Sequence, residues 1–227
     1  AFFFFFYLTS VEISDGVEIV DHDAFWMCEK LTAIRIPYTV KSINASAFNY
    51  CSALESVTVD EANTKYKSDG NCVIESNSKV VFGCKTSVIP TYVTGIGEFA
   101  FRGLLTLTDI RIPDNIVIID GWAFSGCSNL LSIEISSELK NIGEFAFYEC
   151  KNLKDITIPS KVESIDTNAF ADCDNLTSVQ FENTRNWYIS ETDATGTIID
   201  VTNPSTNAVN LVTTYKDYYW KFHSAIA

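Results

Sequence analysis

Short runs of alternating apolar and polar residues recur along the chain. Val11-x-Ile13, Ile34-x-Ile36 and Ile156-x-Ile158 are three of these runs, and alternation with a period of two is typical of a β-strand with one buried face. A residue type that caps helices or tolerates a positive φ follows the run, as Asp21 and Asn44 do. The pattern predicts one short strand and one short helical turn in each unit.

An Ala-Phe dipeptide fixes the length of the unit. The Phe residues of this dipeptide, called the motif Phe residues below, are Phe25, Phe48, Phe101, Phe124, Phe147 and Phe170. They are separated by 23, 53, 23, 23 and 23 residues. The long interval divides into a regular unit at 84–106 and a 30-residue variant at 54–83, in which segments 71–75 and 79–82 flank a Ser-Asn-Ser turn and predict a hairpin.

The period divides the chain into a repeat region at 1–182 and a C-terminal cap at 183–227. The expected units are a partial repeat 1–7, repeats 8–30, 31–53, 54–83 (the variant), 84–106, 107–129, 130–152 and 153–175, and a last strand at 176–182. A single unit buries too few side chains to offset the entropy of ordering it, so the units must stack. We predict a right-handed, mainly β solenoid with a parallel stacked sheet.

The start of the chain fits the same register. Ala1-Phe2 precedes Ala24-Phe25 by 23 residues, so the first residues are expected to end a repeat that begins upstream, in a longer protein. The apolar run that follows Ala1 lacks a basic flank and is not expected to be a signal peptide.

The repeated unit resembles that of a known family. Residues 107–129 read Leu-Thr-Asp-Ile-Arg-Ile-Pro-Asp-Asn-Ile-Val-Ile-Ile-Asp-Gly-Trp-Ala-Phe-Ser-Gly-Cys-Ser-Asn, similar to the leucine-rich repeat of the BspA-like, Treponema-type class of bacterial surface proteins. The resemblance implies a leucine-rich repeat solenoid in a cell-surface or secreted adhesion protein without enzymatic activity, which would bind a host matrix protein, a glycoprotein or a neighbouring cell. A passive spacer that presents another domain is the alternative.

The charge balance narrows the choice of partner. The chain has 29 acidic and 16 basic residues and a formal charge of -13, a field that repels nucleic acid and anionic lipid. No apolar run approaches the roughly 20 residues that cross a bilayer. We therefore expect a protein or glycan ligand, no nucleic acid, no membrane insertion within this segment, and a monomer.

Most cysteines fall at one position of the repeat, three residues after the motif Phe. They are Cys28, Cys51, Cys127, Cys150 and Cys173. Leu104 takes the same position in another unit, which indicates a packing role. Neighbouring strands lie about 4.8 Å apart, a poor match to the roughly 3.5–4.5 Å between disulfide Cβ atoms. We expect a ladder of buried thiols, and a bridge between Cys72 and Cys84 remains open.

Catalytic and cofactor chemistry find little support. The two histidines, His22 and His223, have no Cys-x-x-Cys pair beside them, so neither a metal site nor a nucleophile–base pair is expected. Segment 95–100 matches the Gly-x-Gly-x-x-Ala form of a dinucleotide motif, but 141–146 shows the same template without the first glycine, so the repeat explains it. The expectation is no cofactor and no enzyme.

Two surfaces are candidates for ligand binding. The outward strand positions would form one continuous face, made of Glu12, Arg35, Thr58, Arg111, Glu134, Thr157 and Gln180. Phe99, Trp122 and Phe145 lie two residues before the motif Phe in three successive units. These three form either an exposed binding strip or a plain stack between repeats without a ligand.

Overall fold

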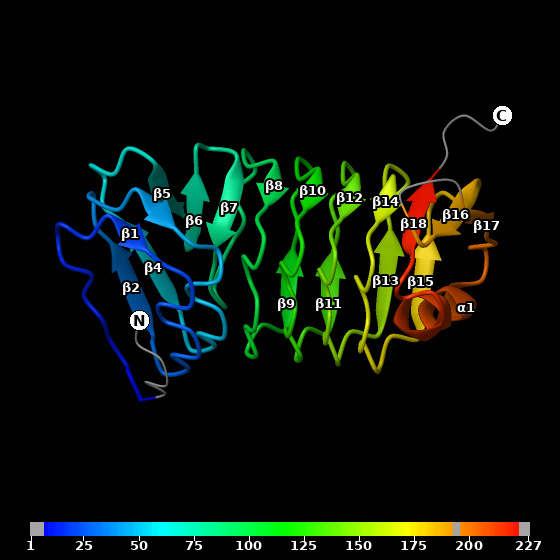
Figure 1. The fold of residues 1–227 in the computed structure, drawn as a ribbon, viewed down its shortest axis with the longest axis horizontal. Helices are drawn as coiled ribbons and strands as arrows, with labels where there is room; N and C mark the ends of the chain where they lie inside the picture. Colours follow the sequence, from blue (N-terminus) through cyan, green and yellow to red (C-terminus); the bar gives the residue numbers. More distant parts are fainter. Residues whose placement is uncertain (1–6, 193–195, 223–227) are drawn as a thin grey trace.

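The repeats stack along one axis from the N-terminal to the C-terminal end (Figure 1). The computed structural model describes residues 7–192 and 196–222. The partial repeat expected at 1–7 therefore lies almost wholly outside the described residues, as does His223.

The strands predicted from the alternating runs pair in parallel. They are β2 (Ala33–Ile36), β4 (Ser56–Val59), β9 (Asp109–Arg111), β11 (Ser132–Glu134), β13 (Asp155–Ile158) and β15 (Ser178–Phe181). Pairs β2–β4, β9–β11 and β13–β15 are in a 23-residue register, with Ile34 opposite Val57 as one example. The parallel stacking expected from the Ala-Phe spacing is confirmed.

A second, two-residue strand in most repeats was not predicted. These strands are β1 (Ile19–Val20), β3 (Ser42–Ile43), β8 (Gly95–Ile96), β10 (Ile118–Ile119), β12 (Asn141–Ile142) and β14 (Ser164–Ile165). Strands β8, β10, β12 and β14 pair in parallel within a ten-stranded sheet. Two residues are too few to show alternation in a sequence, so only pairing with the neighbouring repeat defines them.

Two repeats lack the strand expected from the alternating run. Residues 11–13 are not paired as a strand, and Ser10 makes a single bridge to Ala33. In repeat 84–106 the Val88 N–H donates to the carbonyl of Gly70, 2.8 Å away. On this side the repeat lies against the turn at residues 70–71 and not against a strand.

The segment around each motif Phe is a series of hydrogen-bonded turns. The Ala24 N–H donates to Asp21 O and the Ala47 N–H donates to Asn44 O, at 3.2 and 3.1 Å, so the residues expected to begin a helical turn accept its first bond. Residues two before and two after the motif Phe have positive φ in several repeats. These left-handed residues prevent the turn from continuing as an α-helix.

The variant repeat forms the hairpin predicted for it. Strands β6 (Cys72–Glu75) and β7 (Lys79–Phe82) pair antiparallel, which confirms the prediction, and β5 (Tyr66–Asp69) adds a third strand on the other side of β6. Strand β7 pairs in parallel with β8. The variant repeat thereby begins the ten-stranded sheet, whose order is β17-β16-β18-β14-β12-β10-β8-β7-β6-β5.

The hairpin separates two hydrophobic cores. The N-terminal core extends from Ile13 to Cys84 and includes Val73 and Phe82. The C-terminal core includes Cys72, Ile74 and Val80 and continues to Trp220. Neighbouring residues of β6 thus point into different cores, because successive side chains of a strand face opposite sides.

The motif Phe rings are buried and stack from one repeat to the next. Ring centroids are 5.1 Å apart for Phe25–Phe48, and 5.1, 5.4 and 5.2 Å apart along the series Phe101–Phe124–Phe147–Phe170. In the variant repeat Phe82 stacks on Phe48 at 4.2 Å. Phe82 therefore takes the place of a motif Phe in the N-terminal core.

All seven cysteines are buried and unbridged. The Cys51 thiol donates to the carbonyl of Phe25, 3.2 Å away, and Cys173 makes the same contact with Phe147 at 3.0 Å. Cys72 and Cys84 belong to the C-terminal and N-terminal cores, respectively. Burial raises the pKa of the Cys72 thiol to about 12, so it is protonated at neutral pH.

The C-terminal segment closes the last repeat on three sides. It contains β16 (Trp187–Ser190), β17 (Thr197–Ile198), α1 (Pro204–Val209), a π-helical turn (Asn210–Thr214) and β18 (Tyr219–Phe222). Strand β18 pairs antiparallel with β14, and Asn168 donates its N–H to Lys216 O. On the third side α1 packs on β15, where the buried Asn207 amide donates to Val179 O and Val201 O at 2.9 Å each.

Candidate functional site

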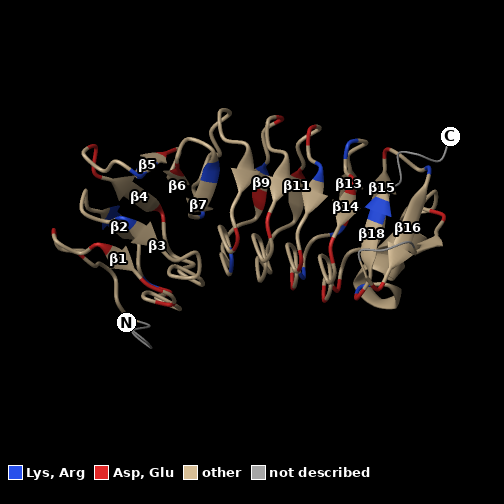
Figure 2. Ribbon diagram, turned by 45° about the horizontal axis from the view of Figure 1, so that its top comes forward, with Lys and Arg blue, Asp and Glu red and all other residues tan. Residues whose placement is uncertain are grey.

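The outward strand positions predicted from sequence are all exposed. They are Glu12, Arg35, Thr58, Arg111, Glu134, Thr157 and Gln180. Charges on this face are largely paired: Arg35 binds Asp60, and Arg111 Nε lies 3.2 Å from the Glu134 carboxylate in the next repeat. Figure 2 shows acidic and basic positions scattered along the whole stack. The strand face therefore offers neither an aromatic anchor nor a concentration of charge.

The three aromatic residues of the second candidate surface lie side by side and half-buried. Trp122 stacks on Phe145 with ring centroids 4.1 Å apart and on Phe99 at 6.2 Å. Tyr148 contacts Trp122 and Phe145 edge-on, at 6.0 and 5.5 Å. Hydrogen bonding to Asp172 raises the pKa of Tyr148 to about 12. We call Phe99, Trp122 and Phe145 the aromatic column.

The backbone of the aromatic column is left-handed. Its φ values are 60°, 59° and 55° for Phe99, Trp122 and Phe145. Asp23 and Asn168 hold the same repeat position elsewhere and also have positive φ, but short polar residues tolerate that region while bulky ones are held there at a cost of about 1–2 kcal/mol each. The three central repeats therefore place aromatic side chains against the local backbone preference.

Tyr50 joins this surface from a distant part of the sequence. Its N–H donates to Arg102 O at 3.2 Å, because the variant hairpin does not reach this edge and repeat 31–53 meets repeat 84–106 directly. The Tyr50 ring lies over Gly103, where an added Cβ would come within 2.4 Å of it. At Gly126 an added Cβ would come within 3.1 Å of the Tyr50 hydroxyl. The two glycines leave room for the ring.

Arg102 lies among these rings. Its guanidinium carbon is 4.8 Å from the Trp122 ring centroid, 5.2 Å from that of Phe99 and 5.7 Å from that of Tyr50. Its Nε is buried without a hydrogen-bond partner, and the guanidinium makes no ion pair with any residue that the structure describes. We call Tyr50, Phe99, Arg102 and Trp122 the Arg102 patch.

Sequence reasoning found Phe99 and Trp122 but missed Tyr50 and Arg102. Tyr50 and Arg102 are brought together across the variant repeat, so the 23-residue period does not connect them. The sequence signal for Tyr50 was the pair Gly103 and Gly126, two residues after the motif Phe. Glycine leaves space at these two positions, and the Tyr50 ring fills it.

A shallow polar hollow of about 360 Å³ adjoins Trp122. Gly121 and Gly143 form part of its wall, and an added Cβ at Gly143 would come within 2.5 Å of the Gly121 backbone nitrogen. Its hydrogen-bonding groups are those of Glu98, Asp120, Asn141, Glu144 and Asp166. The hollow is therefore rich in hydrogen-bond acceptors.

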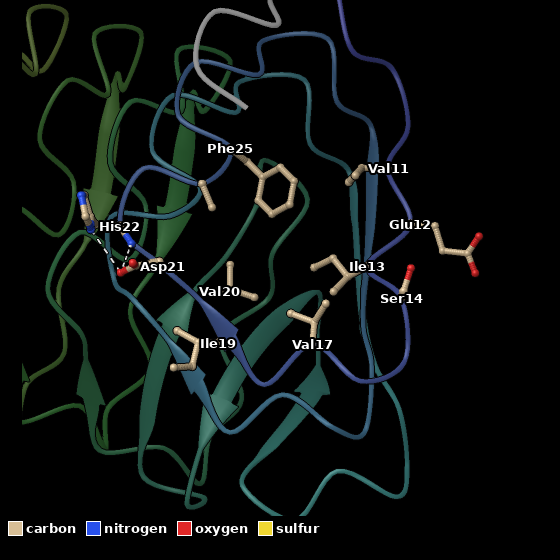
Figure 3. Close-up of a pocket in the computed structure, with 11 residues that line it drawn as sticks. Val11, Glu12, Ile13, Ser14, Val17, Ile19, Val20, Asp21, His22 and Phe25 are labelled. Carbon is tan, nitrogen blue, oxygen red and sulfur yellow. Dashed lines mark hydrogen bonds and ion pairs between the residues drawn. The ribbon is translucent and has the colours of Figure 1, made fainter. Parts of the chain in front are cut away.

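A larger cavity of about 560 Å³ lies at the N-terminal end of the stack (Figure 3). Its apolar lining includes Val11, Ile13 and Phe25, and the His22 ring contacts the Asp21 carboxylate at its rim, 3.1 Å away. These apolar side chains occupy interior positions of the repeat. In other repeats the same positions are covered by the neighbouring repeat. We interpret the cavity as the stacking face of a repeat and not as a ligand site.

The described residues contain neither a metal cluster nor a membrane-spanning helix. Within residues 7–192 and 196–222, no group of three or more His, Cys, Asp or Glu side chains is arranged to hold a metal ion. No helix in the same described ranges is both long and apolar enough to cross a bilayer.

The stacked units, the parallel strands in 23-residue register and the Phe ladder define a leucine-rich repeat solenoid. The chain belongs to the family described as the BspA type leucine rich repeat region, which matches residues 1–76 and 74–191 in 6 copies. This family is the one that the sequence resemblance indicated. No curated protein matches the chain.

Solved structures of bacterial proteins share the fold. A leucine rich cell surface protein from Faecalibacterium prausnitzii is 25% identical with a TM-score of 0.61, and the match covers 78% of this chain and 61% of that one. The pneumococcal vaccine antigen PcpA is 18% identical with a TM-score of 0.67, over 79% of this chain and 52% of that one. A leucine-rich repeat protein from Eubacterium ventriosum is 19% identical with a TM-score of 0.57, over 75% and 54%. The matched part is thus between half and two thirds of each of these proteins.

Proposed function

We propose that this chain is a non-enzymatic binding module of a bacterial cell-surface or secreted protein, and that the aromatic column with the Arg102 patch is its recognition surface. The ligand is a macromolecule, either a protein or a glycan, such as a host matrix component or the surface of a neighbouring cell. Family membership supports the repeat-protein role, and the similar cell surface protein of Faecalibacterium prausnitzii supports the location.

The observation that carries the proposal is the left-handed backbone of half-buried aromatic residues. Phe99, Trp122 and Phe145 have positive φ, whereas asparagine, as at Asn168, would relieve the strain at the same position. Strain that persists beside exposed aromatic surface is characteristic of recognition sites, and aromatic residues with arginine dominate binding energy at interfaces. The strand face includes Arg35 and Arg111, but none of its residues is aromatic or has a positive φ.

A binding assay separates the two surfaces. The purified chain is applied to immobilised matrix glycoproteins and glycans, and the assay is repeated with Trp122→Ala and Arg111→Glu. We expect Trp122→Ala to abolish the signal and Arg111→Glu, on the strand face, to preserve it. The opposite pattern would move the binding site to the strand face.

A second variant distinguishes recognition from plain stacking between repeats. Phe145→Asn relieves the left-handed strain and removes the ring. For a recognition surface we expect binding to fall while the melting temperature stays the same or rises. A melting temperature lowered together with an unchanged binding signal would show that the aromatic column serves only packing.

The spacer alternative makes a different prediction for the same assay. A spacer that presents another domain would give no signal on any immobilised component, and Trp122→Ala would then change nothing but stability. Ion pairing along the strand face, as between Arg111 and Glu134, is compatible with that inert role.

A further inference from the structure

We propose that the Arg102 patch binds the carboxylate of an acidic saccharide, with hydroxyl groups of the same saccharide lying in the polar hollow beside Trp122. This inference rests on the proposed function and names the chemistry of its ligand. It follows from the unpaired hydrogen-bonding groups of the patch, from the charges around it and from the state of the backbone at this edge.

The patch presents three polar groups without protein partners. The Arg102 guanidinium, the Trp122 indole N–H and the Tyr50 hydroxyl make no hydrogen bond to another side chain or backbone group in the described part of the chain. Each of them donates, and guanidinium groups form strong charge-assisted hydrogen bonds with carboxylates. The aromatic rings add to this preference, because their edges carry partial positive charge.

Trp122 presents its edge because its two faces are occupied. Phe145 stacks on it at 4.1 Å with an interplanar angle of 17°, while Arg102 lies over the ring at 4.8 Å. A ligand approaching from solvent therefore meets the edge of the ring beside a cation. This arrangement favours an anionic oxygen.

The surroundings favour a ligand with one negative charge. The hollow beside Trp122 carries Glu98, Glu144 and Asp166, together with Asp120, which pairs with Lys79, and the chain as a whole has a charge of -13. A polyanion would bring several charges into this field and be repelled. A saccharide with one carboxylate can place this carboxylate against Arg102. Its hydroxyl groups can then donate to the protein carboxylates of the hollow and to Asn141.

The backbone disfavours an extended peptide as the occupant. The N–H groups of Trp122, Phe124 and Gly126 already donate to carbonyls of the next repeat, at 2.9, 2.8 and 2.7 Å. A peptide that adds to a sheet needs unpaired backbone groups at an edge. At this edge those N–H groups are already hydrogen-bonded to the next repeat. Recognition here must come from side chains, which suits a ligand rich in hydroxyl groups.

The test uses the full chain and two probes. Sialyllactose carries one carboxylate on its terminal sugar, and lactose is its neutral remainder. Calorimetric titration and the NMR signal of the Trp122 indole N–H report binding. We expect sialyllactose to bind and shift that signal, and lactose to bind at least about tenfold more weakly.

Variants tie the effect to the patch. Arg102→Gln keeps a hydrogen-bonding side chain without charge and should weaken sialyllactose binding at least about tenfold, while Arg111→Gln on the strand face should leave it unchanged. Tyr50→Phe keeps the ring and the charge of the patch but removes the hydroxyl. We expect it to weaken sialyllactose binding less than Arg102→Gln does. Melting temperatures show whether each variant is folded.

The outcomes separate this inference from the proposed function. Equal binding of lactose and sialyllactose would overturn the carboxylate site, and so would failure of sialyllactose to bind. Binding of a Glu-rich peptide or of heparin in place of sialyllactose would assign the patch to another class of ligand and overturn it as well. If matrix binding that depends on Trp122 persists in those cases, the proposed function stands and only the saccharide is rejected.

Discussion

The two cores are built from the same 23-residue unit but are closed in different ways. In the C-terminal core the two-residue strands belong to one ten-stranded sheet, which ends in β16, β17 and β18. In the N-terminal core β1 and β3 form a separate two-stranded sheet, and the apolar cavity of Figure 3 lies at its outer end. The comparison shows that the repeat supplies stacking contacts, whereas closure depends on segments outside the repeat pattern.

The variant hairpin closes the N-terminal core from inside the chain. Val73 packs into that core, while Ile74 packs into the other. The Ile43 N–H, which would otherwise pair with a following strand, donates to the Tyr66 hydroxyl at 3.1 Å. The hairpin thus caps one core and begins the other, and its strand β6 is buried on both faces.

The largest effect is expected from removing the proposed cap, residues 183–227. Truncation after Glu182 exposes the edges of β14 and β15, which β18 and α1 cover, and unpaired strand edges promote aggregation. We expect the truncated chain to aggregate in size-exclusion chromatography. A truncated chain that stays monomeric with an unchanged melting temperature would show the segment to be an appendage.

A smaller difference is expected between the Phe ladders of the two cores. Phe124 is 0% exposed, while Phe48 in the N-terminal core is 6% exposed. Phe124→Ala should cost about 3–5 kcal/mol of unfolding free energy, and Phe48→Ala should cost less. Chemical denaturation measures both, and equal costs would mean that the two ladders are equally well packed.

The hairpin allows each core to be weakened separately. Ile74→Ala should cost about 2–5 kcal/mol and accelerate amide exchange first in the C-terminal core, for example at Ile119. Val73→Ala removes less volume and should act first on the N-terminal core, for example at Ile34. Hydrogen exchange followed by NMR reports the two regions separately. Uniform acceleration in both variants would show that the hairpin couples the cores into one cooperative unit.

The smallest effect concerns the buried thiols. Burial raises the pKa of Cys127 to about 12 and raises that of Cys51 as well, so both folded cores hold protons that an unfolded thiol, with a pKa of about 8.5, releases. Their contribution to stability is complete below that pH and is lost as the pH rises toward 12. Denaturation in reductant between pH 8 and 10 should show this decline.

Cys127→Ala provides the matched control for the pH series, because it removes one titrating thiol from the C-terminal core. The decline should be shallower in this variant. A pH profile that does not change would mean that the thiol is solvated in the native state, contrary to its full burial.

The repeat spacing predicted which residues are neighbours wherever the 23-residue register holds. Ile34 opposite Val57 and the stacking of Phe124 on Phe147 both follow from it. The Ser-Asn-Ser turn between apolar runs likewise predicted the hairpin of the variant repeat. Second strands such as β10 could not be predicted, because two residues show no alternation and their pairing depends on neighbours.

By itself the sequence determined the solenoid, since each unit needs its neighbours to bury an apolar face and the period states which units are neighbours. Only the tertiary structure decided how the variant repeat changes the contacts between its neighbours. It directs Val73 and Ile74 into separate cores and places Tyr50 against Arg102, 52 positions further along the sequence. The physical reason is that the variant repeat extends the sheet along one edge of the solenoid but does not reach the edge that carries Tyr50 and Arg102. The spacing of repeats along the sequence does not show at which edge the variant repeat is absent.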